Sequence, residues 1–99
     1  MASLRRVRQF ESRVQKQREI YEAALERVGQ AQWAAYYAIR ASEDVVRDQG
    51  STQALEKARR NEQEARQAFD SAERAQREAY GELQRLEALL QSLRAGHIP

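Results

Sequence analysis

The chain has 99 residues, of which 32% are charged and 41% apolar, and it contains only two phenylalanines and no cysteine. A chain of this length forms one domain at most. A composition so poor in large apolar residues favours long helices that share a narrow seam over a compact globular core. The lack of cysteine excludes disulfides, a thiol nucleophile and cysteine-based metal sites.

The charge balance and the hydropathy give little indication of a polyanion or a membrane as partner. The chain contains seventeen Lys and Arg residues and fifteen Asp and Glu residues, which gives a net charge of +2. No apolar run approaches the ~18 residues that a membrane span requires. The basic N-terminal residues are not followed by an apolar segment, so we expect no signal peptide. Together with the absence of cysteine, these features predict a cytoplasmic protein.

Helix-forming residues fill almost the whole chain, with one interior break. We predict a single helical hairpin over 1–99, with helices at about 3–48 and 52–95. The turn is expected at 49–51 and a short tail at 96–99.

The ends of both helices carry capping residues. Ser3 is a candidate N-cap for the first helix, and Ser51 or Thr52 for the second, because their hydroxyls can accept hydrogen bonds from the first free backbone N–H groups. Gly50 and Gly96 are expected to end the two helices in the left-handed conformation.

The apolar residues follow a heptad repeat. Every seventh residue from Val7 and from Phe10 in the first helix, and from Leu55 and from Ala58 in the second, falls on the a or d position of a coiled coil. When the chain is folded back at Gly50, position n of the first helix faces position 100 − n of the second. Each a position then meets a d position, as an antiparallel coiled coil requires.

Side-chain size and charge support this alignment. Tyr21 would face Ala79 and Ala31 would face Phe69, so that a large residue meets a small one at these levels. On the flanks of the seam, four pairs are expected to lie close together: Glu11 with Arg94, Arg18 with Glu87, Arg13 with Glu82, and Leu25 with Tyr80. The predicted fold is therefore an all-α antiparallel coiled-coil hairpin.

A strip of small residues beside the seam provides a candidate face for self-association. Two hairpins that pack through it would form a four-helix bundle. We call this strip the alanine strip, and it consists of Ile20, Ala34, Ala41, Ala68 and Ala75.

One stretch of the first helix is apolar around its whole circumference. It contains Trp33, Tyr36 and Tyr37, which occupy heptad positions that cannot reach the seam. Arg40 extends the same face. Gly29 lies one turn before Trp33, and its lack of a side chain leaves room for a close approach. Trp, Tyr and Arg dominate the energetics of protein interfaces. These five residues are predicted to bind another protein or a second copy of the chain.

The sequence contains few candidate catalytic residues or motifs. His97 is the only histidine, and it follows the last predicted helix. Glu62 occupies a seam position, where a carboxylate is more often solvated from the flank than tuned for chemistry. No phosphate-binding glycine loop or dinucleotide motif is present. We therefore expect no enzymatic activity, no cofactor, no metal and no small-molecule substrate.

Clustered arginines offer a nucleic-acid interface as an alternative. The acidic residues interspersed among them are typical of an ordinary coiled-coil surface, and we favour a protein partner. The clusters consist of Arg5, Arg6, Arg8 and Arg13 near the N-terminus, and Arg59, Arg60 and Arg66 after the turn.

The sequence thus predicts a protein-binding hairpin, such as an adaptor, stalk, chaperone or inhibitor of a larger protein. The alternatives are a nucleic-acid-binding arm and a structural subunit of a helical assembly.

Overall fold

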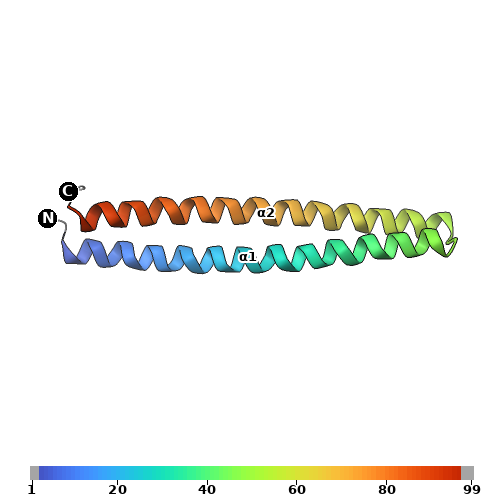
Figure 1. The fold of residues 1–99 in the computed structure, drawn as a ribbon, viewed down its shortest axis with the longest axis horizontal. Coiled ribbons are helices and arrows are strands. Elements are labelled where there is room, and N and C mark those ends of the chain that lie inside the picture. The colour runs from blue at the N-terminus through green and yellow to red at the C-terminus, as the bar shows by residue number, and fades with distance from the viewer. Residues whose placement is uncertain (1–2, 97–99) are drawn as a thin grey trace. The chain divides into compact units, whose positions relative to one another are not determined.

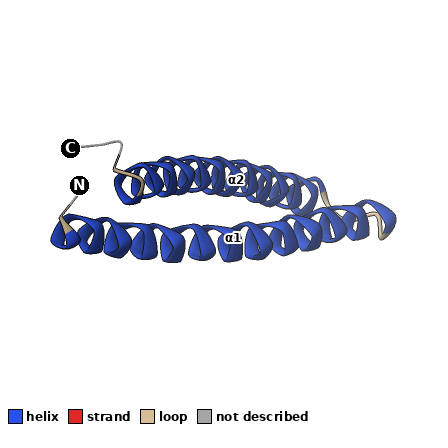
Figure 2. Ribbon diagram, turned by 60° about the vertical axis from the view of Figure 1, so that its left-hand side comes forward, coloured by secondary structure: helices blue, strands red, loops and turns tan. Residues whose placement is uncertain are grey.

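The computed structural model describes residues 3–96, and these form two helices and no strand. Helix α1 spans Leu4–Arg47 and helix α2 spans Thr52–Arg94. The helices pack against each other and run in opposite directions (Figure 1), and loop is confined to the turn and the ends (Figure 2). The predicted all-α antiparallel hairpin is confirmed, with helix ends within a residue or so of those expected from the sequence.

Serine hydroxyls cap both helix N-termini. The Ser3 Oγ accepts a hydrogen bond from the Arg6 N–H at 3.2 Å, and the Ser51 Oγ accepts one from the Ala54 N–H at 3.1 Å. Each cap satisfies one of the N–H groups that have no partner within the first helical turn. Both positions agree with the sequence prediction, and Thr52 is the first residue of α2 rather than its cap.

The turn differs from the prediction in one respect. Gln49, and not Gly50, adopts the left-handed conformation, with a φ of 54°. The Gln49 N–H donates to the Val46 carbonyl at 3.2 Å and the Gly50 N–H donates to the Val45 carbonyl at 2.9 Å, which is the bonding pattern of a Schellman motif. Glycine is required at position 50 for space, because a Cβ there would lie 2.8 Å from Cγ1 of Val45.

The end of α2 follows the prediction. Gly96 has a φ of 76°, and its N–H donates to the Leu93 carbonyl at 3.1 Å. A left-handed glycine closes the helix here at no steric cost.

The heptad seam accounts for the burial along both helices. Every a and d position, from Val7 to Val45 in α1 and from Leu55 to Leu93 in α2, is buried or half-buried. The spacing of the apolar residues therefore predicted the packed face of each helix correctly.

Contacts divide the chain into two compact units, of which the first joins Met1–Leu25 to Ala75–Pro99. Its core is a cluster of large aliphatic side chains, Val14, Leu83, Leu86 and Leu90, against which Val7, Phe10 and Tyr21 pack.

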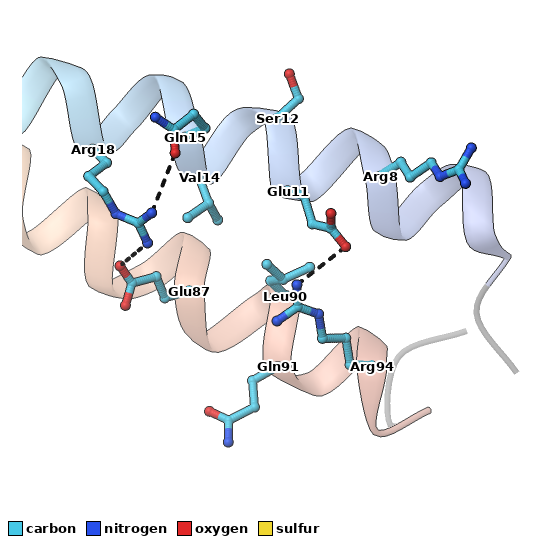
Figure 3. Close-up of a pocket in the computed structure, with 10 residues that line it drawn as sticks. All are labelled: Arg8, Glu11, Ser12, Val14, Gln15, Arg18, Glu87, Leu90, Gln91 and Arg94. Atoms are coloured by element: carbon cyan, nitrogen blue, oxygen red, sulfur yellow. Dashed lines mark hydrogen bonds and ion pairs between the residues drawn. The ribbon is translucent and has the colours of Figure 1, made fainter.

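Contacts across the seam of this first unit agree with the predicted alignment. Arg94 forms an ion pair with Glu11 at 3.2 Å, and Arg18 forms one with Glu87 at 3.6 Å, as expected (Figure 3). The Gln17 side chain, which this alignment sets opposite Leu83, donates to the Ala79 carbonyl one helical turn away at 3.1 Å.

Two other contacts refine the prediction. The Tyr21 ring, expected beside Ala79, lies 5.2 Å from the neighbouring Tyr80 ring between centroids. Glu82, expected near Arg13, is hydrogen-bonded by Arg85 of its own helix at 2.9 Å. That bond lowers the pKa of Glu82, and the charge of Arg13 makes a smaller contribution in the same direction.

The second unit, Glu26–Arg74, has a thinner core. Its buried residues are Ser42 and Ala58, and the remaining seam residues are half-buried. Since burial contributes about 25 cal/mol per Å² of apolar surface, small seam residues stabilise this unit less than the leucines stabilise the first.

Candidate protein-binding surface

Three aromatic side chains and one arginine form a continuous cluster on the outer face of α1. We call Trp33, Tyr36, Tyr37 and Arg40 the aromatic patch. The Trp33 and Tyr37 rings are stacked, with centroids 5.9 Å apart and an interplanar angle of 28°. The Tyr36 ring meets both of them edge-on, at 5.8 Å from Trp33 and 5.6 Å from Tyr37.

The helix geometry fixes this arrangement. Residues three and four apart on a helix are neighbours on its surface, so Trp33 lies next to both tyrosines. All three occupy heptad positions that point away from α2, which explains why the seam does not cover them. Their exposed fractions are 61% for Trp33, 47% for Tyr36 and 63% for Tyr37.

Polar side chains lie at two edges of the three aromatic rings. The Arg40 guanidinium lies 5.9 Å from the centre of the Tyr36 ring, within the range of a cation–π interaction. On the other side Gln32 joins Trp33 and Tyr36 around a surface hollow of about 340 Å³. Sequence reasoning did not single out Gln32, although its position four residues before Tyr36 indicates that it shares this face.

Gly29 precedes Trp33 by one helical turn, and the chain's own packing does not require a glycine there. A Cβ built at Gly29 would have no neighbouring atom within 4 Å. Glycine in a helix interior is less favourable than alanine by roughly 0.5–1 kcal/mol. Gly81 in α2 has the same open surroundings but lies outside the aromatic patch, so it provides a matched comparison.

The predicted alanine strip is exposed in both units. Ile20 and Ala75 belong to the first unit, and Ala34, Ala41 and Ala68 to the second, and each of them is open to solvent. Alanine presents little apolar area, so the strip offers less surface for burial than the aromatic patch does.

The arginine clusters are divided between the two units as well. Arg5, Arg6, Arg8 and Arg13 lie on α1 in the first unit, and Arg59, Arg60 and Arg66 lie on α2 in the second.

Several of these arginines interact within the hairpin. Arg66 forms an ion pair with Glu62 at 2.8 Å, which accounts for the carboxylate at that seam position. The Arg13 guanidinium lies 4.9 Å from the centre of the Phe10 ring. The ion pair with Glu62 offsets the charge of Arg66, which leaves less positive charge available to a phosphate backbone.

A hollow of about 840 Å³ lies beside the seam of the first unit (Figure 3). The ion pairs of Glu11 with Arg94 and of Arg18 with Glu87 cross it, and Arg8 lies at its end. Opposite charges therefore neutralise one another along this surface. Exposed ion pairs of this kind contribute at most about 1 kcal/mol each.

Within residues 3–96 no three His, Cys, Asp or Glu side chains are arranged so that they could hold a metal ion. His97 lies outside the described residues. Over the same described part of the chain, neither helix has a segment long and apolar enough to cross a membrane.

The fold and its surface define a class, the antiparallel helical hairpin with an exposed aromatic patch. Comparison of the chain with protein-family models, with curated proteins and with solved structures found no match. Its function is therefore inferred from the residues of the hairpin themselves.

Proposed function

We propose that this chain is a non-enzymatic protein-binding hairpin that contacts its partner through the aromatic patch. An adaptor, stalk, chaperone or inhibitor of a larger protein would have this form. The observation that supports the proposal is the clustering of Trp33, Tyr36 and Tyr37, held against one another on the outer face of α1 with about half or more of each residue exposed.

The energetics of association favour this face. A fully buried aromatic side chain removes about 150–250 Å² from water. Because the three rings already pack against each other, they would lose less conformational freedom on binding than isolated side chains. Arg40 at the edge adds a charged, planar group of the kind enriched in interface hot spots.

The binding proposal is tested with the double variant Trp33→Ala/Tyr37→Ala. It should abolish capture of the partner from an extract of the native host and leave the helical circular dichroism signal nearly unchanged. The matched controls are Leu4→Ala and Val46→Ala, which remove exposed apolar side chains outside the aromatic patch. A loss of helicity in the double variant would instead assign the aromatic residues to the structure of the hairpin and overturn the proposal.

A second candidate function is that of a structural subunit in a helical assembly. The exposed alanine strip supports it, because small residues allow helices to approach closely. Light scattering of the purified chain distinguishes this function, since it requires a polymer of defined length rather than a monomer or dimer. The absence of cysteine supports a cytoplasmic location for either function.

A further inference from the structure

The face of α1 that carries the aromatic patch has a space beside its largest side chain. Trp33 projects from the outer face, and Gly29 lies one turn before it on the same face with no neighbouring atom within 4 Å of where a Cβ would be. When two copies of the chain pack through this surface about a two-fold axis, the large side chain of each copy can fill the gap of the other.

A two-fold axis midway between Gly29 and Trp33 produces this match. It sets Gly29 of each copy opposite Trp33 of the other, so that each indole fills the space above the other copy's glycine. The same axis sets Glu26 opposite Tyr36, where the carboxylate can accept a hydrogen bond from the phenolic hydroxyl. All four residues belong to the second unit, and the three that carry side chains are exposed.

We propose that the aromatic patch binds a second copy of this chain, with the two α1 helices antiparallel and Trp33 seated against Gly29 of the other copy. This inference rests on the proposed function and names the partner for the same surface. It also explains why an interior helix position that has room for a side chain is occupied by glycine.

Other alignments of the two copies fit less well. A shift that sets Trp33 opposite Tyr36 places two large aromatic side chains against each other and leaves no indole opposite Gly29. A parallel arrangement sets Trp33 against Trp33 and Gly29 against Gly29, so that bulk meets bulk and gap meets gap. Charge does not distinguish the alignments, because the proposed one sets Glu22 opposite Arg40 but also Glu19 opposite Glu43. Size does, since only the antiparallel alignment with Gly29 opposite Trp33 sets an indole against a gap.

A mixing experiment tests the pairing directly. The variants are Gly29→Trp, which sets two indoles against each other, and Trp33→Gly, which leaves two gaps. Each should weaken self-association by at least about tenfold in sedimentation equilibrium, since truncating a Trp hot spot commonly costs this much or more. An equimolar mixture of the two variants should restore a dimer with affinity close to that of the wild type, because every indole then meets a glycine.

Two controls separate a specific pairing from a general effect of the substitutions. Gly81→Trp adds an indole on the outer face of the first unit and should leave self-association unchanged. Circular dichroism of each variant checks that the hairpin still forms, because Trp33→Gly introduces a second glycine into the same part of α1. The double variant Gly29→Trp/Trp33→Gly keeps the wild-type composition and should self-associate again.

The outcomes separate this inference from the broader proposal. A wild-type chain that stays monomeric, or a mixture that does not associate, overturns the second-copy pairing. Loss of host-protein capture in Trp33→Ala/Tyr37→Ala would then still support a binding surface for a different protein. If both experiments fail, the aromatic patch has neither role.

Discussion

Replacing the two open glycines by alanine tests whether Gly29 is retained for binding at a cost in stability. Both Gly29 and Gly81 lie inside helices, and a Cβ at either would meet no atom within 4 Å. Alanine should therefore stabilise the isolated hairpin by roughly 0.5–1 kcal/mol at each position, because it restricts the unfolded chain without causing a clash. For a domain of this size the melting temperature should rise by about 2–8 °C.

The two variants should differ in association. At Gly29 the new methyl group would occupy the space that we assign to the indole of the other copy, so self-association should weaken while thermal stability rises. At Gly81 stability should rise without any effect on association. Thermal unfolding is followed by circular dichroism at the lowest usable protein concentration, where the monomer dominates, and association is followed by sedimentation.

The decisive measurement is the stability of Gly29→Ala. If this substitution destabilises the dilute hairpin while Gly81→Ala stabilises it, glycine at position 29 is required by the fold itself. The space beside Gly29 would then belong to the packing of the hairpin, and its assignment to a binding partner would lose its support.

Three further predictions concern the hairpin alone. Leu86→Ala should lower the free energy of unfolding by about 2–5 kcal/mol in urea titrations, because this side chain is only 4% exposed, whereas Leu4→Ala at 66% exposure should change it by less than about 0.5 kcal/mol. Gln49→Gly should raise stability by up to about 1 kcal/mol in the same titration, since it relieves a left-handed φ of 54°. Arg85→Ala should raise the pKa of Glu82 toward its ordinary value in an NMR titration. In the wild type the Glu82–Arg85 interaction stabilises the fold above the unfolded-state pKa of Glu82, and this stabilisation is lost as the pH falls through the lowered folded-state pKa.

The seam was predictable because the heptad spacing indicates which face of each helix is apolar. From Val7 to Leu93 the a and d positions are all buried or half-buried, and the ion pairs of Glu11 with Arg94 and of Arg18 with Glu87 formed as expected. Long periodic segments determine packing through many independent residues, so a few polar exceptions do not change the result.

The turn and the details of the binding surface were less predictable. The general preference for glycine in the left-handed conformation pointed to Gly50, but Gln49 adopts that conformation. Glycine stands at position 50 for a different reason, because a Cβ there would contact Val45. Glu82 similarly bonds Arg85 in its own helix rather than Arg13. Such outcomes depend on local geometry over a few ångströms, which residue types alone do not specify.

The uneven core connects stability with binding. In the first unit Leu83, Leu86, Leu90 and Leu93 are buried, whereas in the second unit only Ser42 and Ala58 fall in that class. The unit that carries the aromatic patch is therefore expected to open locally at a lower free energy, so its backbone amides should exchange with solvent faster at low protein concentration.

Because a ligand that binds only the folded form stabilises it by RT ln(1 + [L]/Kd), association through the aromatic patch should slow exchange in the second unit. Hydrogen exchange measured by mass spectrometry at low and high concentration tests this coupling, with Trp33→Ala/Tyr37→Ala as the variant in which the concentration dependence should disappear. Equal protection of both units in the dilute wild-type chain would show that the alanine-rich seam is sufficient by itself, and the connection between a thin core and a binding surface would no longer hold.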